Sequence, residues 1–231
     1  MNMIKWCKLN INNTNMKLLQ KILSIPKSLY VSIKLCGFKK GIKLPVLVRY
    51  NTVLRDISGQ VVTPVRGGVI RVGFSGGEGT ADGKYLRSVL EVSGTIIVED
   101  SLNLGVGTRL CVSGTLHVHS MTSTSRLHLV CMDKITVGKN VLIGWDTCIM
   151  DSDMHTIINL NTQELLPKTA EVIIGDGVWV GTRCHILKGS KIPHGSIVGA
   201  RAVVTKSFNT ENAIIVGNPA KVVKTGYTRF K

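Results

Sequence analysis

Apolar residues recur every six positions in the C-terminal half of the chain. A second residue, often small, stands two positions before each of them, as at Cys184, Ser190 and Ser196. A period of six fits neither an α-helix nor an alternating strand. It fits a short strand in which residues two apart share a face, followed by a turn that changes the direction of the chain. The six aliphatic positions are Ile174, Val180, Ile186, Ile192, Val198 and Val204.

Three such sides close a triangular coil, and stacked coils pair as parallel strands about 4.8 Å apart. A single coil cannot bury its apolar side, whereas neighbouring coils bury it for each other. We therefore expect an all-β solenoid over residues 61–224, followed by a tail over 225–231. Apolar residues earlier in the chain keep the six-residue period. Before residue 120, a second set of apolar residues with the same period fits equally well. The earlier positions are Val137, Ile143 and Ile149, then Val92, Val98, Leu104 and Leu110, with Val106, Val112 and Val118 in the second set.

The first 60 residues do not follow this period and are expected to form a partly helical, basic segment. Residues 1–55 carry nine lysines and two arginines but no acidic residue, which is eleven of the fifteen net positive charges. We expect a helix over 15–25 that ends at Pro26, because proline interrupts helical hydrogen bonding. Such a basic amphipathic helix either lies on an anionic membrane or packs on its own body or a neighbouring subunit. Its apolar positions are Leu18, Leu19, Ile22 and Leu23.

The composition indicates the cellular compartment of the protein. None of the six cysteines forms a C-x-x-C pair, so they are expected to be free thiols in a reducing compartment. No apolar run approaches 18 residues, and residues 1–10 lack the apolar stretch of a secretory signal. These features predict a cytoplasmic protein, at most peripheral to the membrane. Nucleic acid is not an expected partner, because no recognition motif accompanies the basic charge.

The six-residue period breaks once, between Ile149 and Ile174, which are 25 positions apart. We therefore expect a loop over about 156–170 to leave the coil. The string DSDMH, residues 151–155, stands directly before it. If the backbone is extended there, Asp151, Asp153 and His155 point the same way. A carboxylate beside an imidazole fixes its tautomer and raises its basicity, as a general base for a hydroxyl nucleophile requires.

A covalent intermediate on a serine or cysteine side chain is not expected. Ser152 lacks the G-x-S-x-G setting of an activated serine. Cys148 and Cys184 are assigned to inward repeat positions, away from any substrate.

The segment 172–224, which begins VIIGDGVWVGTRCHILKGS, resembles the hexapeptide-repeat acyltransferases. Within that family it is most similar to O-acetyltransferases acting on sugars and on capsule or O-antigen glycans, over about residues 90–224. The resemblance implies a left-handed parallel β-helix, a homotrimer with active sites between subunits, and acetyl-CoA as co-substrate. Since DSDMH matches the family's catalytic-histidine segment, it also implies that His155 is the general base. We take Asp153, the nearer carboxylate, as the residue that orients it.

The resemblance also implies a binding site for CoA along the C-terminal coils. Trp179 would lie by the pantetheine or the active site. Lys221 stands where many relatives carry arginine, and lysine keeps the charge but loses the bidentate geometry of a guanidinium. Arg183 and Arg201 are further cations there. The residues expected along the pantetheine arm are Gly181, Thr182 and Ala200, and those expected at the distal end of CoA are Thr205 and Lys206.

Three alternatives remain at this stage. The acceptor could be the amine of an amino-sugar nucleotide, which changes only the nucleophile. The solenoid could be a non-catalytic scaffold, although a scaffold needs neither DSDMH nor the loop. Lastly, His117 and His119 share a strand face and could bind zinc with His155. No third histidine has an obvious spacing, so no metal is expected.

Overall fold

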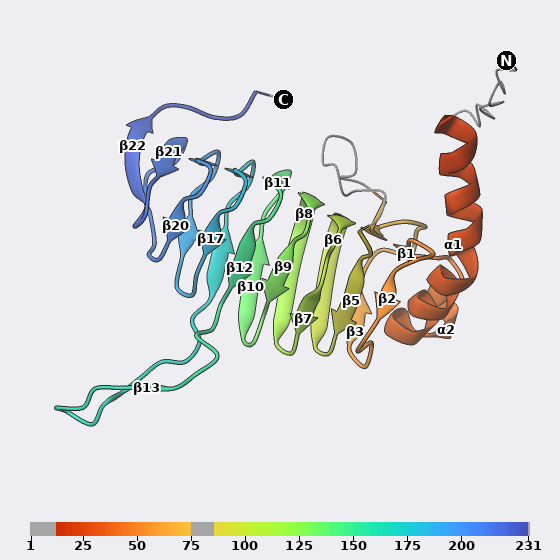
Figure 1. Cartoon of the computed structure of the whole chain (residues 1–231), viewed down its shortest axis with the longest axis horizontal. Coiled ribbons are helices and arrows are strands. Elements are labelled where there is room, and N and C mark those ends of the chain that lie inside the picture. The colour runs from red at the N-terminus through yellow and green to blue at the C-terminus, as the bar shows by residue number, and fades with distance from the viewer. Residues whose placement is uncertain (1–12, 75–85, 231) are drawn as a thin grey trace, which may run out of the picture.

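The computed structural model describes residues 13–74 and 86–230, with side chains from Leu18 onward. Within them, helices α1 (Asn13–Cys36) and α2 (Phe38–Gly41) precede a long stack of short parallel strands. Figure 1 shows the stack running along the molecule, with α1 at one end and a hairpin projecting from the other half. The expected fold class, a left-handed parallel β-helix with a helical N-terminal segment and an extruded loop, is confirmed.

The coils have three faces, and each strand pairs in parallel with the strand of the next coil. β6 (Thr95–Val106) and β8 (Thr115–Ser125) are long enough to turn the corner from the first face to the second. The first face also holds β3 (Gln60–Val62), β10 (Lys134–Val137), β15 (Val172–Ile174) and β18 (Lys191–Ile192). The second also holds β1 (Val46–Val48), β4 (Ile70–Val72), β11 (Val141–Ile143), β16 (Trp179–Val180), β19 (Ile197–Val198) and β21 (Ala213–Val216).

The third face is built from seven strands. They are β2 (Val53–Leu54), β5 (Val89–Val92), β7 (Leu110–Val112), β9 (His128–Val130), β12 (Cys148–Met150), β17 (His185–Ile186) and β20 (Val203–Val204).

The six-residue period marks the inward positions. All six aliphatic residues from Ile174 to Val204 are at most 1% exposed, and so are their partners two positions earlier. Each strand therefore puts one aliphatic and one small or aliphatic side chain into a narrow interior, which explains the low aromatic content of 5%.

The turns between faces use the left-handed region of backbone space at the same period. Gly177, Gly189 and Gly195 have φ of 69°, 72° and 64°, and Arg183 and Arg201, six residues away from them, have 57° and 62°. Glycine adopts this conformation without strain, whereas an arginine does so at a cost.

Helix α1 does not end at Pro26, so this expectation was wrong. It continues to Cys36 with Pro26 inside it, and its ribbon changes direction along its length (Figure 1). A proline inside a helix costs about 3 kcal/mol or more because it removes a hydrogen bond and crowds the preceding turn. Packing offsets that cost, since Val31 and Leu35 beyond the proline are 0% and 4% exposed against the first coil.

Serines line the face of α1 that packs on the coil. Ser28 Oγ donates to Val48 O (3.2 Å) and accepts the Val48 N–H (3.0 Å). Ser32 Oγ likewise donates to Val46 O (2.9 Å) and accepts the Val46 N–H (3.1 Å). These hydroxyls satisfy the edge of β1 that faces away from β4 and that would otherwise be unpaired. With Ser24, they form a serine row at four-residue spacing.

Because the serine row, with Val31 and Leu35, is the buried side of α1, many of the other apolar side chains of the helix face outward. These exposed residues are Leu18, Leu19, Ile22, Leu23, Ile25, Leu29 and Tyr30. The helix therefore packs on its own body and still presents an apolar surface.

The coils begin earlier than the expected boundary at residue 61. β1 pairs with β4 from Val46 onward, and β2 pairs with β5, so residues 46–60 belong to the first coil. At the other end, β22 (Lys221–Thr225) turns back antiparallel on β21. The following residues run along the coil, where Tyr227 N donates to Asn212 O (2.8 Å) and Arg229 Nη2 to Asn140 O (3.1 Å).

The expected loop forms an arm that stands away from the coil. Its strands β13 (Ile157–Ile158) and β14 (Leu165–Leu166) pair antiparallel. At its base, Ser152 bridges to Thr169 and Ala170 N donates to Asp151 O (2.9 Å). The arm's apolar side chains are exposed, Leu160 by 80% and Leu165 by 61%.

Candidate functional site

The DSDMH segment lies at the corner between the third and first faces, where the chain leaves β12 for the arm. Asp151 is fully buried, and its two carboxylate oxygens accept the backbone N–H groups of Met132 and Asp133, both at 2.8 Å. It therefore holds the turn of the coil below and is not beside His155.

The backbone from Asp151 to His155 is not extended, so the expectation of one shared face was wrong. Met154 has a φ of 63°, and its N–H is held by the hydroxyl of Ser152 at 3.0 Å. This turn separates the directions of Asp153 and His155. The carboxylate of Asp153 instead forms an ion pair with Lys188 (2.5 Å).

Lys188 is a residue of this corner that the sequence did not single out. Its ammonium group binds Asp153 Oδ2 and also donates to Pro167 O (2.5 Å), so it ties together both sides of the arm's base. Lys188 follows β17, one coil further along. Only the stacking of coils brings it to Asp153, which explains why sequence spacing did not reveal it.

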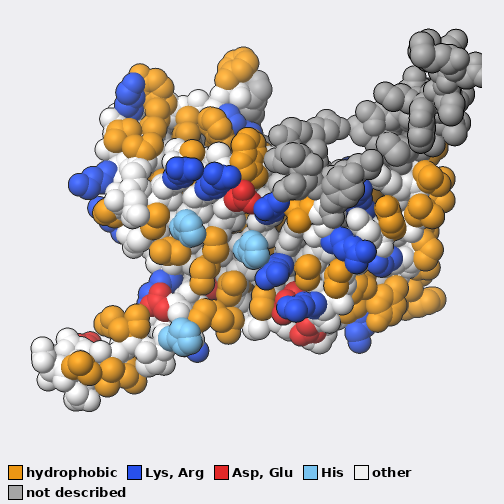
Figure 2. All heavy atoms as spheres, viewed as in Figure 1, with side chains coloured by type: hydrophobic (Ala, Val, Ile, Leu, Met, Phe, Trp, Pro, Cys, Tyr) orange, Lys and Arg blue, Asp and Glu red, His pale blue; other side chains and the backbone are white. Residues whose placement is uncertain are grey.

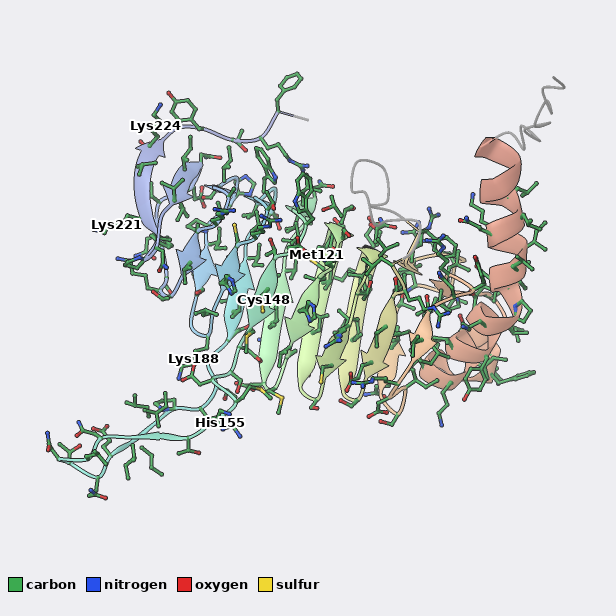
Figure 3. All side chains as sticks on the ribbon, in the orientation of Figure 1. Met121, Cys148, His155, Lys188, Lys221 and Lys224 are labelled. Carbon is green, nitrogen blue, oxygen red and sulfur yellow. The ribbon has the colours of Figure 1, made fainter. Side chains whose placement is uncertain are left out.

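His155 does not take part in the contacts among Lys188, Asp153 and Pro167. It is exposed, and within residues 13–74 and 86–230 it has neither a hydrogen bond nor an ion pair. Figure 3 shows His155 and Lys188 at the root of the projecting arm. An imidazole in this position is open to a proton donor that approaches from solvent or from another chain.

The third face presents a ladder of outward side chains beside this corner. His128, Cys148, His185 and Val203 follow one another from coil to coil. Figure 2 looks onto this face and shows histidines on it, with basic side chains gathered along one edge.

The expectation that both Cys148 and Cys184 point inward holds only for Cys184, which is fully buried. Cys148 is half-buried and outward, because its neighbour Ile149 fills the inward position. Burial raises the pKa of the Cys148 thiol, which keeps it protonated near neutral pH and poorly nucleophilic. Burial, reinforced by Arg109, lowers the pKa of His128, so that imidazole is neutral there.

Two of the residues expected to bind CoA lie at the same corner as His155. Thr205 and Lys206 follow β20 and are exposed. Ser207 Oγ donates to Gly189 O (3.0 Å), which stacks their turn on the turn that carries Lys188. The Lys206 ammonium lies 5.7 Å from the centre of the Phe208 ring.

The other expected CoA residues lie elsewhere. Trp179 points outward from the second face and is 39% exposed. Gly181, Thr182 and Ala200 lie at the corner between the second and third faces. Thr182 Oγ1 is buried and lacks a partner among the described residues. Lys221 lies in β22 and is exposed.

Cations stack along that same corner. Arg126, Asp146, Arg183 and Arg201 occupy successive coils, all with positive φ. Asp146 lies 3.9 Å from Arg126 and 3.7 Å from Arg183, and no acidic side chain pairs with Arg201 in the described residues. Within the described residues, Arg201 is therefore the arginine of this column whose charge no carboxylate compensates. The third face lies between this column of side chains and His155. A single chain therefore does not bring all the expected site residues together.

His117 and His119 lie on the first face, away from the arm. Glu99 pairs with both of them, at 2.7 Å to His117 and 3.5 Å to His119. In the parts of the chain that the structure describes, no three His, Cys, Asp or Glu residues are arranged to hold a metal ion.

The chain is similar to known acetyltransferases in sequence. No protein-family profile matches the chain. The putative lipopolysaccharide biosynthesis O-acetyl transferase WbbJ of Escherichia coli K12 is 30% identical over 151 residues, covering 61% of this chain and 74% of the relative. A chloramphenicol acetyltransferase of Escherichia coli is 26% identical over 146 residues, covering 54% and 69%. Among solved structures, the polysialic acid O-acetyltransferase OatWY has a TM-score of 0.46 at 24% identity, covering 75% and 78%.

Proposed function

Because the chain belongs to the hexapeptide-repeat acetyltransferases, we propose that it transfers an acetyl group from acetyl-CoA to a hydroxyl of a surface glycan, with His155 as general base. The observation that carries this proposal is the position of His155 at the root of the arm, where its exposed imidazole has no hydrogen bond or ion pair with any described residue. The lipopolysaccharide role in the name of the K12 relative supports a glycan acceptor.

The proposed reaction is a direct transfer. The imidazole of His155 takes the proton of the acceptor hydroxyl while the hydroxyl oxygen attacks the thioester carbonyl. The C–S bond then breaks, the acetyl group stays on the acceptor oxygen, and the proton passes to the departing CoA thiolate. Lys188 supports this chemistry indirectly, because it fixes Asp153 and the base of the arm around His155.

The proposed donor site rests on charge and on the family resemblance. Lys206, Arg201 and Lys221 are exposed cations suited to CoA phosphates. We place the pantetheine arm along the corner that holds Gly181, Thr182 and Ala200, as the family resemblance implies. We place Trp179 and Thr205 at the edges of this site.

A homotrimer would complete the site. The residues expected around the donor are divided between two corners of one coil, which in neighbouring subunits can face each other. The exposed apolar side chains of the arm, such as Leu160 and Leu165, also suit burial against a second copy. We propose that the arm of one subunit covers the donor site of the next.

The N-terminal segment suggests where the enzyme works. None of the helices in residues 13–74 and 86–230 is both long and apolar enough to cross a bilayer. We propose a cytoplasmic enzyme that touches an anionic membrane through residues 1–55, where the acceptor glycan would be linked to lipid.

Replacing His155 tests the chemistry. His155→Ala should lower kcat by roughly 10²–10⁴-fold, with acetyl-CoA binding and folding retained because the side chain makes no contact that the fold needs. CoA thiol release is measured with a panel of glycans and amino-sugar nucleotides. His185→Ala, an exposed histidine on the third face, is the matched control.

The outcomes separate the alternatives. Full activity of His155→Ala would overturn its role as base. Release only with amino-sugar nucleotides, to give an amide product, would establish N-acetylation. No release with any acceptor would favour the non-catalytic scaffold.

A further inference from the structure

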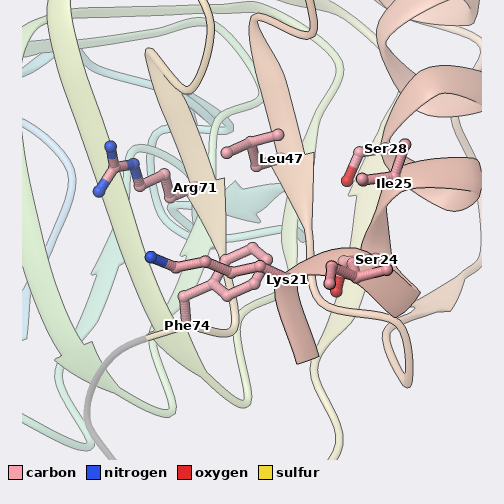
Figure 4. Close-up of a pocket in the computed structure, with 8 residues that line it drawn as sticks. Lys21, Ser24, Ile25, Ser28, Leu47, Arg71 and Phe74 are labelled. Carbon is pink, nitrogen blue, oxygen red and sulfur yellow. The ribbon is translucent and has the colours of Figure 1, made fainter. Parts of the chain in front are cut away.

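A pocket lies between α1 and the second face at the N-terminal end of the stack, apart from the corners described above. Its volume is about 280 Å³. Figure 4 shows how α1 forms one wall and the first coils form the other. The lining residues are Lys21, Ile22, Ser24, Ile25 and Ser28 from α1, and Leu47, Arg71 and Phe74 from the coils.

The wall of this pocket is effectively apolar. Ile22, Ile25, Leu47 and Phe74 contribute hydrocarbon and ring surface. The two serines have used their hydroxyls within the protein. Ser24 Oγ donates to Gln20 O (2.5 Å) and accepts the Tyr50 N–H (2.9 Å), and Ser28 holds both polar groups of Val48. A ligand in the pocket would therefore be recognised by its apolar part.

Two cations stand at the pocket. The side chains of Lys21 and Arg71 extend toward the same side of it (Figure 4). Arg71 Nε donates to Gly68 O (3.2 Å), which leaves its terminal nitrogens available. Among the described residues no acidic side chain pairs with either cation, so within those residues an anion held there would meet two uncompensated charges.

The pocket opens onto the outward apolar side of α1. Ile22 and Ile25 line it and are also 53% and 48% exposed, and Leu18 and Leu29 extend the same apolar surface along the helix. A ligand chain that leaves the pocket would thus pass onto apolar surface and would not enter water.

We propose that this pocket takes one hydrocarbon chain of an anionic membrane lipid, with the lipid phosphate bound by Lys21 and Arg71. The volume lies just below the range of about 300–1,000 Å³ typical of small-molecule pockets, which suits part of one chain better than a whole bulky ligand. The pocket would make the proposed membrane contact specific for anionic lipid. One lipid chain is held in the pocket while the exposed apolar side of α1 lies in the membrane–water interface.

The test compares two single-chain lipids below their micelle concentrations. Lysophosphatidylglycerol and lysophosphatidylcholine share the chain but differ in net charge. Native mass spectrometry or calorimetry on the full chain should show one bound lysophosphatidylglycerol per subunit and at least tenfold weaker binding of lysophosphatidylcholine. Inorganic phosphate, which has the anion without the chain, should not bind.

Variants locate the site. Leu47→Trp, which fills the pocket, should abolish lipid binding, and Lys21→Gln with Arg71→Gln should weaken lysophosphatidylglycerol by tenfold or more. Lys39→Gln with Lys40→Gln also removes two positive charges, on α2 outside the pocket, and should bind as the unmodified chain does.

Equal binding of both lipids, or binding that survives Leu47→Trp, would overturn the proposal. So would association between chains that is lost in Leu47→Trp without any lipid binding, because the occupant would then be a second copy. Acetyl transfer to a short oligosaccharide is measured in parallel. If it fails in the unmodified chain, the proposed reaction is wrong while the lipid result still stands.

Discussion

Asp151 and Asp153 stand two positions apart and have different roles. Asp151 is buried and accepts two backbone N–H groups. Asp151→Asn should lower the free energy of unfolding by about 1–3 kcal/mol, because an amide offers one acceptor oxygen and leaves a buried N–H unpaired. Urea denaturation measures this. Asp153→Asn is the control, since its partly exposed ion pair with Lys188 should contribute about 1 kcal/mol or less. Equal losses in the two variants would contradict this division.

The donor affinity is expected to depend on Lys206. A lysine that contacts a CoA phosphate contributes about 1.5–3 kcal/mol, so Lys206→Ala should raise the KM for acetyl-CoA by roughly ten- to a hundredfold with little change in acceptor KM. Lys224→Ala is a close match, because both ammonium groups lie 5.7 Å from an aromatic ring centre. An unchanged donor KM in Lys206→Ala would place this lysine outside the CoA site.

At the scale of elements, the serine row joins α1 to the stack. Ser28→Ala should lower the free energy of unfolding by about 1–3 kcal/mol, because the N–H and C=O of Val48 lose their partner in a dry interface. Thermal or urea unfolding checks the size of the effect. Leu19→Ala on the exposed side of α1 should be close to neutral. A larger loss for Leu19→Ala than for Ser28→Ala would mean that the helix packs by its apolar side.

The helices and strands also show which parts of the fold could be predicted from the sequence. The six-residue period correctly placed every inward residue from Val172 to Val204, since that spacing is imposed by the coil itself. It could not predict that α1 continues through Pro26, because tertiary packing decides that outcome. It also missed residues 46–60 as the first coil, because the six-residue spacing from Val46 to Thr52 slips before the next buried position, Val61.

The candidate site was predictable only where it is local. The segment with His155 was found from its composition and its place before the break. Lys188 was missed, and Asp153 was given the wrong neighbour, because both depend on how one coil stacks on the next. The same limit applies to the CoA residues, whose division between two corners is a property of the three-sided coil.

At the scale of the whole molecule, the arm predicts assembly. Leu160 and Leu165 are exposed by 80% and 61%, so aspartate at both positions should leave the single chain folded. If these side chains are buried against a second copy, Leu160→Asp with Leu165→Asp should shift the protein from trimer to monomer and reduce activity together. Sedimentation velocity measures the first effect. Thr162→Asp, on the same arm, is the control. A trimer that persists in the double variant would show that the arm does not hold it together.

At each end of the stack one element runs across the repeat and covers part of the last coil, α1 on β1 and the reversed strand β22 on β21. A stack left open would offer the last coil of one molecule to the first coil of another. That contact is head-to-tail and has no rotation that closes it, so it would add molecules without limit and grow fibres. The two end elements therefore set the length of the particle, and the protein remains a discrete catalyst because its repeat is terminated at both ends.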